Sequence, residues 1–146
     1  MSKKHIFRYW VMLFFSLVML TGCAGLADYS IDLPGNYSVV RTSAHQVTVA
    51  PKISDTGTGP AIIPTKVTEV AWDDNYILVK QLDLMDDPNS SNGYKIPNNN
   101  DEHFWILEFK SGKLFGPLDE DEYIEKKNEF SISGNVIPKK VSDLKN

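Results

Sequence analysis

The N-terminal segment constrains this chain more than any other feature of its sequence. A basic stretch (residues 1–8) is followed by an apolar run (residues 9–20) and then by small residues that end at Cys23. This order is typical of a secretory signal, which is removed from the mature protein. As a helix the apolar run would span about 18 Å, well short of the ~30 Å hydrocarbon core of a bilayer, so a permanent transmembrane helix is the poorer interpretation.

The end of this leader, Leu20-Thr21-Gly22-Cys23, resembles the lipobox of bacterial lipoproteins. In that class a signal peptidase cleaves before the cysteine, whose thiolate is the nucleophile that accepts a diacylglyceryl group. The resemblance implies that residues 1–22 are a signal peptide and that Cys23 carries the lipid, and we expect no other cofactor. It leaves open an additional N-acyl chain. The alternative is a free or buried thiol behind an ordinary signal anchor.

Cys23 is the only cysteine, so an exported form of the chain has no internal disulfide. Removing residues 1–22 leaves 124 residues, enough for one domain with a modest core. The composition is 42% hydrophobic and 23% charged, which is typical of a folded globular protein. We therefore expect a single domain that is stabilised by burial.

The formal net charge of −4 conceals a basic leader. Without Lys3, Lys4 and Arg8, 12 basic residues face 19 acidic ones, a net charge of about −7. Such a domain repels phosphate backbones, so we expect no nucleic-acid partner. The same charge argues against broad docking on anionic lipids. We therefore expect membrane attachment through the lipid, on the extracytoplasmic face of the cell membrane.

After the leader, short β-rich segments alternate with turn residues. The expected strands are residues 37–42, 46–50, 66–72, 76–82, 104–110 and 113–115. Short turns would join three pairs of neighbours as antiparallel hairpins. The longer connections, residues 51–64 and 85–102, are rich in turn-forming residues and are interpreted as surface loops.

A helix is expected near residues 119–130. Asp119 is a suitable N-cap, and Glu122, three residues later, would complete a capping box. Acidic residues fill the first turn, while Lys126 and Lys127 lie in the last. This distribution matches the helix dipole, which explains the acidic turn better than a basic partner does.

Together these features predict an α+β fold: an antiparallel meander of about six strands, curled or barrel-like, with one C-terminal helix, behind an N-terminal signal helix. The expected organisation follows the chain. It comprises a signal peptide at 1–22, a lipidated cysteine and short tether at 23–33, a β-rich domain at 34–133, and a polar, loosely ordered tail at 134–146.

Two stretches support a family resemblance. They are residues 33–49, beginning Leu33-Pro34-Gly35-Asn36-Tyr37, and residues 104–130, which contain an aromatic strand and the corner Phe115-Gly116-Pro117-Leu118. With the lipobox, they resemble a family of small lipoproteins from Gram-positive bacteria that is known only as a domain of unknown function. The resemblance implies an anchor on the outer leaflet of the cytoplasmic membrane. It supplies no catalytic positions.

Two patterns carry candidate chemistry. Ser43 and His45 are the nearest approach to a nucleophile and base, but they lie in an expected turn without a third orienting motif, which favours a solvated turn over a hydrolase. The loop at 83–101 offers oxygen ligands of the kind calcium accepts, of which the candidates are Asp83, Asp86, Asp87 and Asn89. Counted from Asp87, the spacing fails that of an EF-hand, because Asn98 replaces the bidentate Glu. An irregular cation site and an ordinary soluble loop both stay open.

Aromatic residues on the strands could line a ligand groove, but burial in the core is the favoured interpretation. They are Tyr37, Trp72, Phe104, Trp105, Phe109 and Phe115. The leading functional hypothesis is a non-enzymatic interaction or binding module of the cell envelope, with an unknown envelope protein as partner. The alternatives are a lipoprotein that binds a small ligand or cation through loop 83–101, and a hydrolase.

Overall fold

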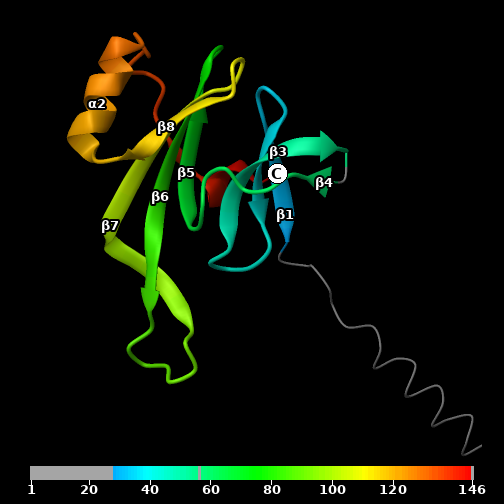
Figure 1. Ribbon diagram of the computed structural model, residues 1–146, viewed down its shortest axis with the longest axis vertical. Helices are drawn as coiled ribbons and strands as arrows, with labels where there is room; N and C mark the ends of the chain where they lie inside the picture. The colour runs from blue at the N-terminus through cyan, green and yellow to red at the C-terminus, as the bar shows by residue number, and fades with distance from the viewer. Residues whose placement is uncertain (1–27, 56, 146) are drawn as a thin grey trace, which may run out of the picture.

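The computed structural model of the protein describes residues 28–55 and 57–145. The expected signal peptide, its cleavage site and Cys23 lie outside these residues. Within them the chain forms two antiparallel sheets and one α-helix (Figure 1).

The first sheet contains four strands in sequence order. They are β1 (Tyr29–Leu33), β2 (Tyr37–Arg41), β3 (Val47–Ser54) and β4 (Gly57–Thr58). Strand β1 lies where the sequence predicted the tether at 23–33, so that part of the prediction is wrong. Its five residues alternate between partly or fully buried and exposed side chains, because Tyr29, Ile31 and Leu33 turn toward the interior.

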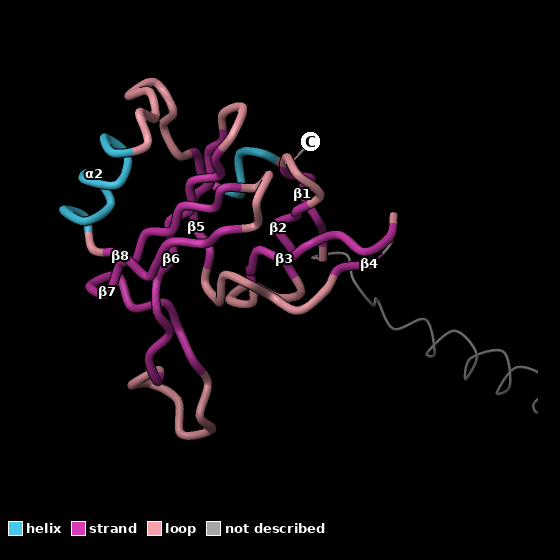
Figure 2. The backbone as a smooth tube through the Cα atoms, turned by 45° about the horizontal axis from the view of Figure 1, so that its top comes forward, coloured by secondary structure: helices cyan, strands magenta, loops and turns pink. Residues whose placement is uncertain are grey.

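The second sheet has the order β8-β7-β6-β5-β9. Its strands are β5 (Val67–Trp72), β6 (Tyr76–Asp86), β7 (Lys95–Glu108), β8 (Lys113–Leu118) and β9 (Lys139–Lys140). Strands β5 to β8 form the expected meander. The prediction of one curled or barrel-like meander is wrong, because the described strands form two separate sheets that do not close into a barrel (Figure 2).

The main core lies where the two sheets face each other. Val39 and Val49 from the first sheet join Val70, Val79 and Leu107 from the second, and each is at most 1% exposed. Fully burying an aliphatic side chain of this size contributes roughly 1.5–3 kcal/mol. The inner faces therefore hold the sheets together without any cross-link.

The opposite face of the second sheet is also covered, by helix α2 (Glu120–Glu129). Tyr123 on this helix stacks on the Phe104 ring with 4.6 Å between centroids. The predicted helix is confirmed, and Asp119 and Glu122 form the expected reciprocal capping box. The second sheet is consequently the middle layer of three.

Both expected long loops contain regular structure. Strand β3 continues to Ser54, and Ile63 is fully buried and bridged to Val49, so residues 51–64 include an anchored segment. Strands β6 and β7 extend into residues 85–102 and leave residues 87–94 between them. The polar composition of residues 85–102 suggested a loop, but pairing between backbones requires no apolar side chain. Asp86 and Lys95 lie opposite each other on these strands, and their side chains form a 2.9 Å ion pair.

The tail also differs from the expectation of loose order at 134–146. Strand β9 pairs with β5 and leads into a short 3-10 helix, Val141–Leu144. Val141 is only 4% exposed and belongs to the main core, although few apolar residues surround it in sequence. Its burial fixes the end of the chain between the sheets, as Figure 1 shows.

Candidate functional site

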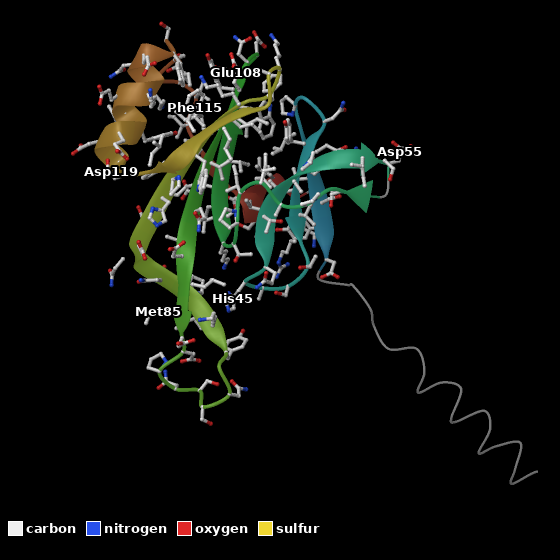
Figure 3. All side chains as sticks on the ribbon, viewed as in Figure 1. His45, Asp55, Met85, Glu108, Phe115 and Asp119 are labelled. Atoms are coloured by element: carbon white, nitrogen blue, oxygen red, sulfur yellow. The ribbon has the colours of Figure 1, made fainter. Side chains whose placement is uncertain are left out.

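A groove of about 1010 Å³ lies along the first sheet. Its lining combines strands β1 and β2, the β3–β4 hairpin, Trp72 and residues 143–145 near the chain end. Asp55 marks the end of this hairpin in Figure 3. Trp72 is 40% exposed, so the expectation that it is a core residue is wrong. The other five aromatic residues of that set are buried or half-buried.

Side chains of both charges line the groove. The Lys52 ammonium lies 3.0 Å from one Asp32 carboxylate oxygen, and the Ser38 hydroxyl donates to the other at 3.2 Å. The hydrogen bond from Lys52 holds the pKa of Asp32 below its usual range. Ser38 is 1% exposed and lies beneath this ion pair, so the groove has a polar floor.

At the start of the described chain, Tyr29 lies near two cations of the same groove. The Arg41 guanidinium is 5.4 Å and the Lys145 ammonium 5.0 Å from the ring centroid of Tyr29. Cations within about 6 Å of an aromatic face are attracted by its quadrupole. The Tyr29 ring thus attracts two cations into the groove, which Asp28 and Asp143 also line.

A second cluster lies on the long β6–β7 ladder. His103 pairs with Gln81; Asp83 lies two residues after Gln81 on β6, and Asp101 lies two residues before His103 on β7. Residues two apart share a face of a regular strand. The ladder is bulged here, because residues 98–101 of β7 lie opposite Asp83 alone. The bulge brings ligand atoms of Asp83, Asp101 and His103 within 4.8 Å of one another.

A buried amide supports this cluster from the core side. Gln81 is 1% exposed, and its amide nitrogen donates to Asp83 Oδ1 at 2.7 Å and to the Thr65 carbonyl at 2.9 Å. The Trp105 indole N–H donates to Gln81 Oε1 at 3.0 Å. Because these bonds use both ends of the amide, Gln81 holds one oxygen of Asp83 in a fixed direction.

The residues predicted for the cation site do not come together in the structure. Asp83 belongs to the cluster, whereas Asp86 pairs with Lys95 and Asp87 accepts from the backbone N–H of Asn89 at 2.9 Å. His103 was not among the candidate ligands predicted from the sequence. The sequence signal is the i, i+2 spacing of Asp101 and His103, and only the strand register shows that Asp83 lies beside them.

Ser43 and His45 make no mutual hydrogen bond within the described residues. The Ser43 hydroxyl accepts from the Gln46 backbone N–H at 3.1 Å, and buried His45 Nδ1 has no partner in this part of the chain. The His45 ring meets Tyr94 edge-to-face at 5.7 Å, and Figure 3 shows His45 beside the long hairpin. This contact fastens the β2–β3 loop to the start of β7.

No helix among residues 28–55 and 57–145 combines the length and apolarity needed to cross a membrane. These residues define a β-rich domain of two antiparallel sheets with one covering helix.

The chain belongs to the family described as a protein of unknown function (DUF3997), whose match covers residues 34–142. The expected resemblance to an uncharacterised domain is thereby confirmed. No curated protein and no solved structure gives a significant match to the sequence.

Proposed function

We propose that the protein is a lipid-anchored, non-enzymatic interaction module of the cell envelope, and that its first-sheet groove holds a mixed-charge segment of an envelope partner protein. The observation that carries this proposal is the position of the groove. Asp28, the first described residue, lines the groove and lies five residues after the lipobox cysteine, Cys23. Cleavage before Cys23 and a diacylglyceryl group on its sulfur would place the anchor on the outer leaflet of the cytoplasmic membrane.

The short separation limits where the groove can lie. Five residues span at most about 18 Å even when fully extended. A ligand in the groove would therefore lie near the membrane surface rather than far out in the envelope. This position supports a partner that is itself held at the membrane.

The groove chemistry supports a partner segment that carries both charges. Arg41, Lys52 and Lys145 line it together with acidic Asp32 and Asp143. Complementary charges across an interface accelerate association and fix the register of the partner. A purely acidic or purely basic segment would meet side chains of its own sign in this groove.

Site-specific photo-crosslinking in cells tests the proposal. A photoreactive residue would replace Thr42, which is exposed in the groove, or Glu125, which is exposed on α2 beyond the second sheet. Each variant is compared in the lipidated chain and in a Cys23→Ala chain. We expect a discrete crosslinked partner from position 42 of the lipidated chain, and its loss from the other three samples.

Three other crosslinking results would contradict parts of this proposal. The same crosslinks from positions 42 and 125 would contradict recognition in the groove. A position-42 crosslink of equal yield in the Cys23→Ala chain would contradict the role of the anchor. No discrete crosslink in any sample would count against an interaction module of either kind.

A further inference from the structure

We propose that Asp83, Asp101 and His103 form a binding site for a divalent transition-metal ion, for which zinc is the best fit. The site lies on the β6–β7 ladder, outside the first-sheet groove, and does not depend on the function proposed for that groove.

The two distances from His103 to the carboxylate oxygens match the ligand spacing of a tetrahedral centre. His103 Nε2 lies 3.3 Å from Asp101 Oδ1 and 3.5 Å from Asp83 Oδ2. Ligand atoms roughly 2.0–2.1 Å from a zinc ion, at a tetrahedral angle, lie about 3.4 Å from one another. All three ligand atoms lie within 4.8 Å of one another, so a small movement of the carboxylate side chains would let one ion contact all three.

Direct hydrogen bonding accounts for the same arrangement less well. Both distances from His103 Nε2 exceed the usual ~2.7–3.2 Å of an N–H···O hydrogen bond. This nitrogen also carries at most one hydrogen, which the two carboxylates would have to share. A divalent cation would bind both carboxylates and the neutral imidazole at once.

The buried support of Asp83 is a second, separate observation. Among the described residues, Gln81 and Ser38 are the buried polar side chains, and burying an amide is costly unless it is hydrogen-bonded. Gln81 is fixed by Trp105 and by the Thr65 carbonyl, and it donates to Asp83 Oδ1. The remaining oxygen of Asp83 is the one that faces His103. Partners of this kind orient metal ligands, and their loss typically weakens metal binding about 10- to 100-fold.

The donor set favours zinc over calcium. Calcium takes about 6–8 oxygen ligands, whereas an imidazole with two carboxylates suits zinc and its neighbours in the first transition row. Asp86 and Asp87 are engaged elsewhere and add no oxygen to this cluster. Three protein ligands also leave a fourth position for water or an exchangeable ligand, because the cluster is half-exposed.

Zinc titration of the full chain in detergent, followed by calorimetry, tests the site. We expect saturable binding of one ion per chain that falls more than about 100-fold in His103→Ala and in Asp101→Asn. Asp86→Asn, an exposed carboxylate change on the same hairpin, is the matched control and should bind as the parent does. Thermal unfolding without metal would verify that each variant is folded.

Cobalt(II) absorption supplies a readout of geometry. The parent chain should show the intense visible bands of tetrahedral cobalt, and His103→Ala should lose them. Gln81→Met should retain one ion per chain with affinity reduced about 10- to 100-fold. The proposal would be overturned if the parent chain did not bind zinc, or if both His103→Ala and Asp101→Asn bound zinc with unchanged affinity. So would binding that is lost in Asp86→Asn but kept in His103→Ala.

Discussion

Tyr123 is buried between helix α2 and the second sheet, and its hydroxyl has no hydrogen-bond partner among the described residues. Burial raises the pKa of Tyr123 from 10.0 to about 12, and the negative charge of Glu69 adds to this effect. The folded state therefore retains the phenol proton at pH values where the unfolded chain ionises. The stabilising effect is complete below about pH 10 and is lost as the pH rises to about 12.

Tyr123→Phe should remove this part of the pH dependence. Urea unfolding at pH 8 should show little change, because no hydrogen bond to the hydroxyl is lost. Between pH 10 and 12 the parent should lose more stability than the variant. Tyr94→Phe is the control, because Tyr94 is 49% exposed. Parallel stability curves for the parent and Tyr123→Phe over that interval would disprove the raised pKa.

Single residues also show what the sequence could and could not predict. The capping residue Asp119 was predictable because a capping box depends on neighbours within one helical turn. The cluster of Asp83, Asp101 and His103 was not, because its members meet only through the register of two strands. Trp72 was misplaced for a related reason: alternation identifies a face but not whether another layer covers it.

At the scale of elements, the packing of the C-terminal tail against the domain depends on one buried side chain. Val141 belongs to the main core with 4% exposure, whereas Ile137 in the same tail is 67% exposed. Val141→Ala should lower the free energy of unfolding by about 2 kcal/mol through lost burial and a residual cavity. Ile137→Ala should change it by less than about 0.5 kcal/mol. Urea unfolding of the full chain measures both.

Equal, small effects of the two substitutions would mean that the tail does not pack in solution. The larger loss at Val141 would instead show that the core includes the chain end. The sequence could not predict this contact, because a lone Val among polar residues carries no periodic pattern. Strand β1 was missed for a different reason: its five residues alternate as a strand does, but they were assigned to the tether that follows Cys23.

At the scale of the whole molecule, the sequence predicted strands, a helix and antiparallel hairpins, but not two sheets. Val39 and Val49 carry the inward-facing pattern of a buried strand face. That pattern fits the interior of a barrel as well as the interface of two sheets. The choice depends on hydrogen bonding between strands far apart in sequence, such as β5 and β9, which periodicity does not encode.

The two proposed sites occupy different parts of this architecture. The groove follows the first sheet beside the start of the described chain, while the Asp83–Asp101–His103 cluster lies on the long hairpin of the second. Metal binding and partner binding are therefore separable, and a defect in one should leave the other measurable.

Intact-mass spectrometry of the protein extracted from cell membranes tests the proposal that a lipid on Cys23 holds this domain at the membrane. We expect a chain that begins at Cys23 and carries at least the mass of a diacylglyceryl group, and no such species from Cys23→Ala. A membrane-extracted chain that retains residues 1–22, or one with an unmodified Cys23 thiol, would contradict it.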